Sequence, residues 1–184
     1  IKITRYIRSV KNFNGTVLIV SNPVDFLSYL IYHESGLLSN QIYGIGLGLD
    51  KKRLSTLTNK DLEVIGEHGD EIKIVKIKND QMTQIDSPDL LSKLVSYSNL
   101  VRFFTPRTRF GPAHEILSVI NGLRKKNSQI RVSTKRDGYF SGDILNLKDR
   151  IPMTKYANSS TLEKTLTLTK KQFEKYSKLL NPKP

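Results

Sequence analysis

The sequence predicts an α/β fold that begins with a parallel βα unit and continues as an α+β region. Residues 16–20 are continuously apolar and rich in β-branched side chains, the pattern of a strand buried on both faces of a parallel sheet. Residues 129–168 have a strand-rich pattern with a turn signal at Asp137-Gly138, which indicates an antiparallel sheet. With 184 residues, of which 38% are hydrophobic, the chain can bury one core or two small ones.

The elements between these two regions alternate between strand and helix patterns. Asn22 can cap the helix that follows the first strand, and Gly36 can end it. Pro112 begins another helix, in which Ile116, Leu117, Ile120 and Leu123 are expected to face inward. The expected strands are 16–20, 41–46, 62–65 and 71–78, the last half-exposed or at an edge, and the expected helices are 1–13, 22–36, 50–58, 86–104, one from Pro112 and one from Thr169 to Asn181.

The net charge of +13 raises the question of an anionic partner, because such an excess can attract nucleic acid or lipid. The basic residues are scattered in short groups such as Lys51-Lys52-Arg53 and Arg124-Lys125-Lys126, and no run reaches five. No zinc-finger or RNA-binding motif accompanies them, so a solvated surface is favoured over a nucleic-acid interface. No apolar run reaches the roughly 20 residues that a membrane helix needs.

Cysteine is absent from the sequence, so neither a disulfide nor a thiolate metal site can form. No metal site is expected. A chain without cysteine is compatible with the cytoplasm, which is the expected location.

The turn Gly66-Glu67-His68-Gly69-Asp70 directly follows an apolar strand pattern. Its imidazole is therefore held at a strand end, and an imidazole titrates near neutral pH, so it can exchange a proton with an alcohol or a carbonyl oxygen. A single histidine in a turn is more often structural or merely exposed, so this motif alone does not decide between the two interpretations.

Two other segments with polar side chains also follow apolar strand patterns. They present Asn22 after the first strand, and Asp50 with Arg53 after the second. Ligands of α/β sheets gather at the carboxyl ends of strands, which favours a common site with His68. The glycine-rich segment 44–48 does not have the spacing GxGxxG of a dinucleotide site, and we interpret it as a close approach of the backbone beside a site.

The segments VSNPVDFLSYL, GLGLDKKRL and VIGEHGDE, in this order, resemble signature stretches of the L-lactate dehydrogenases and their malate relatives. The stretch 108–113 is similar to the family's substrate-specificity helix entry, and TLEKTLTLTKKQFEKYSKLL to its last strand and helix. Glu67 favours the lactate branch. The resemblance implies that residues 1–46 are the remnant of a Rossmann-like nucleotide-binding half and residues 47–184 the substrate-binding C-terminal domain.

The resemblance also implies a role for each site residue. His68 is expected to be the catalytic acid and base, paired with Asp50, while Arg53 binds the substrate carboxylate. Asn22 is expected to contact both substrate and cofactor. Thr108 is expected to touch the substrate side chain, and Pro112 to lie near the nicotinamide ring. The implied cofactor is NAD, the ligand a small 2-hydroxy or 2-keto acid, and the assembly a homo-oligomer.

Each of these residues also has a plain structural explanation. Asn22 and Asp50 can be helix caps, Arg53 a surface cation, and Thr108 and Pro112 turn or first-turn residues. The family's nucleotide-binding half, with its glycine fingerprint and an arginine loop, is expected to precede the helix with which this sequence begins. Two functions therefore stay open: the catalytic part of an NAD-dependent L-2-hydroxy-acid dehydrogenase, or a truncated, inactive relative that acts as a binding or structural protein.

Overall fold

The structure is a computed structural model that describes residues 2–10, 12–69, 71–79, 81–104, 110–125 and 128–156, with Glu174 and Lys178 as isolated positions. The helix expected between Thr169 and Asn181 lies outside the described residues. None of the helices in the described ranges is long and apolar enough to cross a membrane.

The described strands form one mixed sheet with the order β1-β2-β6-β7-β3-β4-β5, and β8 pairs with β7. Only β1 and β2 run parallel to each other, and every other described pairing is antiparallel. This arrangement confirms a parallel beginning followed by an antiparallel region. The strands are β1 (Val17–Ile19), β2 (Ile42–Gly44), β3 (Glu63–Glu67), β4 (Glu71–Lys78), β5 (Gln81–Gln84), β6 (Gln129–Arg136), β7 (Tyr139–Asn146) and β8 (Ile151–Pro152).

One expectation about the strands needs correction, and for β4 the structure decides between two alternatives that the sequence left open. β1 is the last strand at its end of the sheet, and of its residues only Ile19 is buried, so β1 is not buried on both faces. β4 lies between β3 and β5 and is therefore not an edge strand, although it is half-exposed: Ile72 and Ile74 are buried and Lys76 points outward. Lys76 and Lys78 are exposed although they alternate in step with buried Ile72 and Ile74, so exposure increases toward the end of β4 and does not separate its two faces.

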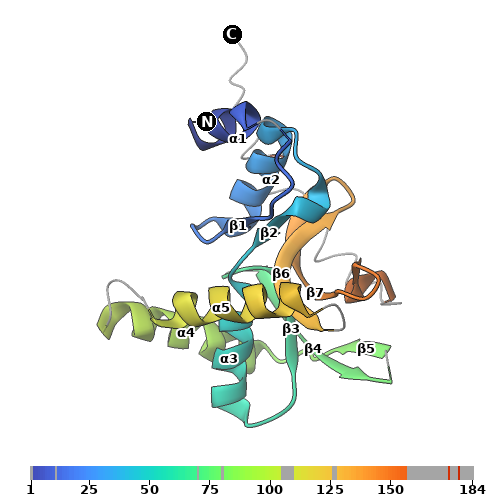
Figure 1. Ribbon diagram of the computed structural model, residues 1–184. Helices are drawn as coiled ribbons and strands as arrows, with labels where there is room; N and C mark the ends of the chain where they lie inside the picture. The colour runs from blue at the N-terminus through green and yellow to red at the C-terminus, as the bar shows by residue number, and fades with distance from the viewer. Residues whose placement is uncertain are drawn as a thin grey trace.

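The helices divide into two groups, as Figure 1 shows: α1 and α2 lie at the end of the molecule that carries β1 and β2, and α3, α4 and α5 gather at the other end. The helices are α1 (Lys2–Ser9), α2 (Val24–Ser35), α3 (Leu47–Thr58), α4 (Pro88–Phe104) and α5 (Phe110–Arg124), with short 3-10 turns η1 (Ser39–Gln41) and η2 (Met153–Tyr156).

The ends of α2 and α3 differ in part from the sequence-based expectation. Gly36 ends α2 in the left-handed conformation at φ 73°, as expected, because this conformation suits a residue without Cβ. Asn22 does not cap the helix: Pro23 occupies the cap position, and no side chain bonds the first turn. α3 begins at Leu47 rather than near Asp50, so Asp50 lies inside its first turn.

Of the four α5 residues expected to face inward, Ile116 and Leu123 do so and the other two do not. Leu117 and Ile120 are 60% and 37% exposed, so the expectation that they face inward was wrong. Val119 is buried, and Ile116 and Leu123 pack beside it against β2, β6 and β7. α5 is apolar around much of its circumference, so helical spacing alone could not choose between the two stripes.

Two apolar clusters fix the helices whose first turns approach the site. Val24 of α2 packs with Ile42 and Phe140 of the sheet. Leu47 and Leu54 of α3 belong to a second cluster, together with residues of β3, β4 and α4. These apolar clusters thus fix α2 and α3 against the sheet.

The turn between β6 and β7 has φ 45° at Asp137 and φ 93° at Gly138, which confirms the expected tight hairpin.

Candidate active site

Four of the residues singled out in the sequence line one cavity of about 310 Å³. They are Asn22, which follows β1, Arg53 of α3, His68, which follows β3, and Pro112 of α5. The rest of the lining is apolar and consists of Val20, Ile45 and Leu49. The fold therefore brings together segments that are far apart in the sequence.

Asp50 lies beside this cavity and holds both His68 and Arg53. Nδ1 of His68 and Oδ2 of Asp50 are 2.5 Å apart, and Nη1 of Arg53 donates to Oδ1 of Asp50 at 2.9 Å. Asp50 is only 1% exposed. The spacing of three residues places Asp50 and Arg53 on the same face of α3. Because a carboxylate only accepts hydrogen bonds, Nδ1 carries the hydrogen, and Nε2 is the ring nitrogen left for a ligand.

The pKa of His68 lies above its usual value as the result of opposing effects. Burial of the ring lowers it, because the charged imidazolium loses hydration. The hydrogen bond and the charge of Asp50 raise it, the charge of Asp25 raises it further, and the charge of Arg53 lowers it. The carboxylates prevail, so the site stabilises the imidazolium form and suits transfer of a proton at neutral pH.

Gly46 makes room for the ring of His68. A Cβ on Gly46 would lie 2.6 Å from Cγ of His68, closer than side chains pack. Its φ of 178° is extended, so the requirement for glycine is steric and not conformational. Gly48 is covered in the same way by the carboxylate of Glu115. The expected close approach of the glycine-rich segment beside a site is confirmed.

The lysines next to Arg53 point away from the His68 cavity. Nζ of Lys51 lies 3.2 Å from the carboxylate of Asp61, and Nζ of Lys52 lies 2.6 Å from Nδ1 of His114. Both lysines line a separate cavity of about 100 Å³, with Glu115 and Arg131. Within the described lining of the His68 cavity, Arg53 is thus the one cationic side chain besides the imidazole.

One residue of this neighbourhood was not predicted from the sequence. The backbone N–H of His68 donates to Oδ2 of Asp25 at 3.0 Å, and Asp25 is 1% exposed. The available signal was a charged residue inside the apolar start of α2, directly after the strand. Thr108 lies outside the described residues, so its expected role stays a prediction. The described residues contain no cluster of three or more side chains suited to a metal ion.

No protein-family model matches the chain, but curated relatives do. L-lactate dehydrogenase 3 of Bacillus cereus is 32% identical over 105 residues, which cover 44% of this chain and 33% of the relative. The malate dehydrogenase of Archaeoglobus fulgidus is 30% identical over 128 residues, 62% of this chain and 41% of the relative. The L-lactate dehydrogenase of Bacillus pumilus is 25% identical and covers 92% of this chain and 61% of its own length.

Solved structures show the same relationship at the level of the fold. The malate dehydrogenase of Archaeoglobus fulgidus in complex with NADH superposes with a TM-score of 0.76 at 21% identity, covering 95% of this chain and 64% of that chain. The L-lactate dehydrogenase of Clostridium thermocellum gives a TM-score of 0.75 at 22% identity, and the match covers 95% of this chain and 68% of that chain.

The mixed α/β fold is therefore that of part of a dehydrogenase. More closely, the homologues of this chain are the L-lactate and malate dehydrogenases, and it matches between a third and about three fifths of the length of the curated relatives described above.

Proposed function

We propose that this chain is the substrate-binding and catalytic portion of an NAD-dependent L-2-hydroxy-acid dehydrogenase of the lactate type. The observation that carries the proposal is the shared cavity of His68 and Arg53, with Asp50 bonded to both. An acid–base group and a carboxylate-binding group thus meet in one space, which is the pair that a 2-hydroxy acid requires.

In this proposal His68 moves the proton. Asp50 fixes the ring through Nδ1, so Nε2 takes the proton of the substrate hydroxyl in oxidation and returns it to the carbonyl oxygen in reduction. The carboxylate of Asp50 stabilises the imidazolium that oxidation produces. Reduction of a keto acid accordingly requires protonated His68, and oxidation of a hydroxy acid requires the neutral ring.

Arg53 and Asn22 orient the substrate. Arg53 uses one N–H on Asp50, and its remaining donors serve the substrate carboxylate, for which the planar guanidinium is well suited. Arg53 has a side chain that is 16% exposed, so this ion pair is shielded from water. The amide of Asn22 donates to the substrate oxygen. Thr108 is proposed to touch the substrate side chain.

The cavity wall fits the ring of a nicotinamide. Its apolar lining by Ile45, Leu49 and Pro112, next to the polar amide of Asn22, suits a flat ring with an apolar face. The oxidised cofactor, when bound, would accept the hydride in oxidation, and its reduced form would supply it in reduction. Residues 1–46 are proposed to belong to the nucleotide-binding half, and residues 47–184 to the substrate-binding half. A cytoplasmic location and a homo-oligomer are part of the same proposal.

Titration with NADH, followed by assays with pyruvate and oxaloacetate, tests the proposal. His68→Asn should lower keto-acid reduction by at least about 100-fold, because general acid catalysis contributes on this scale. His33→Asn, a substitution at an exposed position of α2, is the matched control and should keep full activity. Unchanged pyruvate reduction in His68→Asn would refute proton transfer by His68. Binding of ligands without turnover in the wild-type chain would instead favour the inactive relative.

A further inference from the structure

Asp25 contacts the candidate site from an element that carries none of the proton-transfer residues. It lies in the first turn of α2, three positions after Asn22, and is 1% exposed. Its Oδ2 accepts the backbone N–H of His68 at 3.0 Å. Asp50 holds the ring of His68 from α3, so two carboxylates hold the same residue at different atoms.

Packing does not explain a carboxylate at this position. Oδ1 of Asp25 makes no well-formed hydrogen bond within the described residues; the group that faces it is the hydroxyl of Ser133 on β6, which lies near enough to lower the pKa of Asp25. Asp25 also forms no ion pair with a lysine or arginine in the part of the chain that the structure describes. A buried carboxylate oxygen that is only weakly hydrogen-bonded destabilises the fold, so an apolar side chain would serve packing better than an aspartate. Buried titratable groups with shifted pKa values cluster at functional sites.

The charges around His68 come from two helices. Asp50 and Arg53 face it from α3, and Asp25 faces it from α2. The negative charge of Asp25 raises the pKa of the imidazole. Burial raises the pKa of Asp25 itself, while the Ser133 hydroxyl, the His68 N–H and the charge of the imidazole lower it, and Asp50 raises it. Asp25 and His68 therefore influence each other's protonation.

We propose that Asp25 is a second positioning residue for His68, which anchors the backbone of the His68 turn to α2 and stabilises the imidazolium. The anchor also joins the loop of Asn22 to the turn of His68, because Asp25 follows Asn22 by three positions at the start of α2. The catalytic meaning of this role rests on the function proposed above, whereas the contact and its effect on the imidazole do not.

Asp25→Asn tests the proposal, because asparagine keeps an acceptor for the N–H of His68 and removes the charge. The imidazole titration is followed by NMR of the ring protons, with the His68 signal assigned from its loss in His68→Asn. The chain has 3 histidines, so His33 and His114 serve as internal references. We expect the pKa of His68 to fall by about one unit. Asp89→Asn, which removes an exposed charge on α4, should leave it in place.

An unchanged His68 titration in Asp25→Asn would overturn the proposal and leave Asp25 a purely structural residue. A measurement on the wild-type chain needs no variant: the His68 amide proton should shift as the Asp25 carboxyl titrates, and an amide signal that does not follow this titration would also overturn it. In turnover with NADH and pyruvate, Asp25→Asn should move the basic limb of the kcat/KM profile to lower pH. Absence of turnover in the wild-type chain would count against the proposed function alone, because the NMR titration is independent of it.

Discussion

Asp50 is shared between two positively charged partners, and this sharing is the central electrostatic fact at the scale of single residues. One oxygen holds the imidazole of His68 and the other the guanidinium of Arg53. A buried carboxylate is costly unless it is paired, and here both of its oxygens are paired. Any change at Asp50 is therefore expected to affect proton transfer and carboxylate binding together.

Asp50→Asn should lower the pKa of His68, because the charge of Asp50 and its hydrogen bond raise this pKa more than any other group does. Burial and the charge of Arg53, which lower the pKa of His68, would then weigh more. Keto-acid reduction needs the protonated ring, so its basic limb should move to lower pH by about one to three units. The pH profile of kcat/KM measures this shift. A profile that stays in place would show that Asp50 does not govern the imidazole.

Arg53→Lys should weaken binding of the substrate carboxylate while the positive charge is kept. The ammonium of lysine cannot make the planar pair of hydrogen bonds, so KM for pyruvate should rise by roughly 10- to 100-fold. The value of kcat should change much less, because His68 and Asp50 remain paired. Steady-state kinetics at saturating NADH separate the two constants, and an equal fall in kcat with unchanged KM would contradict this role of Arg53.

Much of the composition of the site was predictable, because Asn22, Arg53 and His68 follow strand patterns that can be recognised locally and Pro112 lies in a stretch that resembles the family's. Asn22, Arg53, His68 and Pro112 were named from their motifs, and the fold brings them to one cavity. Asp25 was missed because its partner is a backbone N–H at the end of a distant strand, and no local pattern reports such a contact.

At the scale of elements, two glycines at the start of α3 leave the space that neighbouring side chains occupy. Gly46 precedes the helix and leaves the space in which the His68 ring lies. Glu115 of α5 covers Gly48, so α5 lies close against the same turn. The position of the imidazole therefore depends on two backbone positions without side chains.

Gly46→Ala should displace the ring of His68, because the new Cβ would lie 2.6 Å from Cγ of the imidazole. A displacement on the scale of 1 Å at a reacting group reduces turnover about 100-fold. The fold should persist, since the φ of 178° is allowed for alanine. Gly138→Ala is an instructive comparison: it lies in the hairpin turn at φ 93°, where it should lower stability and leave turnover of the folded protein unchanged.

Apolar spacing located most of the described helices and strands, but it missed β5, which has a single apolar residue, and it did not fix all of the ends and faces. α3 begins three residues earlier than expected, because the backbone of Gly46 accepts the first bond of the helix from Leu49. The edge position of β1 and the inner position of β4 depend on which strands pair, which is a property of the whole sheet. Local periodicity carries no information about such pairing.

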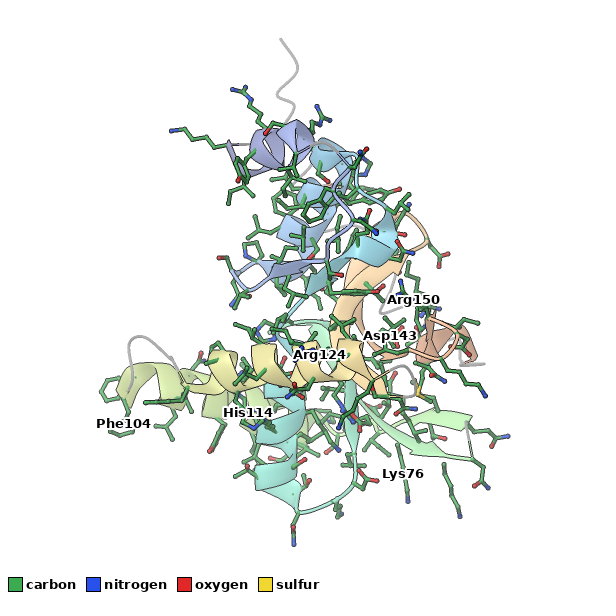
Figure 2. The ribbon with its side chains drawn as sticks, viewed as in Figure 1. Lys76, Phe104, His114, Arg124, Asp143 and Arg150 are labelled. Atoms are coloured by element: carbon green, nitrogen blue, oxygen red, sulfur yellow. The ribbon has the colours of Figure 1, made fainter. Side chains whose placement is uncertain are left out.

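At the scale of the whole molecule, a further buried carboxyl, that of Asp143, does not line the cavity of His68. Asp143 lies on β7 (Figure 2) and is 2% exposed. Asp143 accepts the backbone N–H of Ile144 at 2.7 Å and the hydroxyl of Thr154. Burial raises its pKa from 3.8 to about 6, while the Thr154 hydroxyl, the N–H groups and Arg136 oppose this.

The free energy of unfolding should therefore fall with rising pH on account of Asp143. Its pKa is higher in the folded than in the unfolded chain, so its contribution is fully present below 3.8 and is lost as the pH rises through about 6. The difference between the pKa of Asp143 in the folded chain and in the unfolded chain corresponds to roughly 3 kcal/mol in the free energy of unfolding. Denaturant unfolding across this range should show the fall in the wild-type chain and a flatter dependence in Asp143→Asn. Asp137→Asn, at an exposed turn position, should keep the wild-type slope.

The order of strands has a consequence for the speed of folding. β2 meets β6 at the pair Gly44 and Ser133, and β3 meets β7 at the pair Gly66 and Gly142, so both junctions join distant parts of the chain. Such non-local pairings lose the entropy of closing a long loop before they gain stabilising contacts, and they therefore form late. The helices can form early from local contacts, but Asn22 and His68 come together only when β6 and β7 enter the sheet. The cavity is thus among the last parts of the native structure to appear.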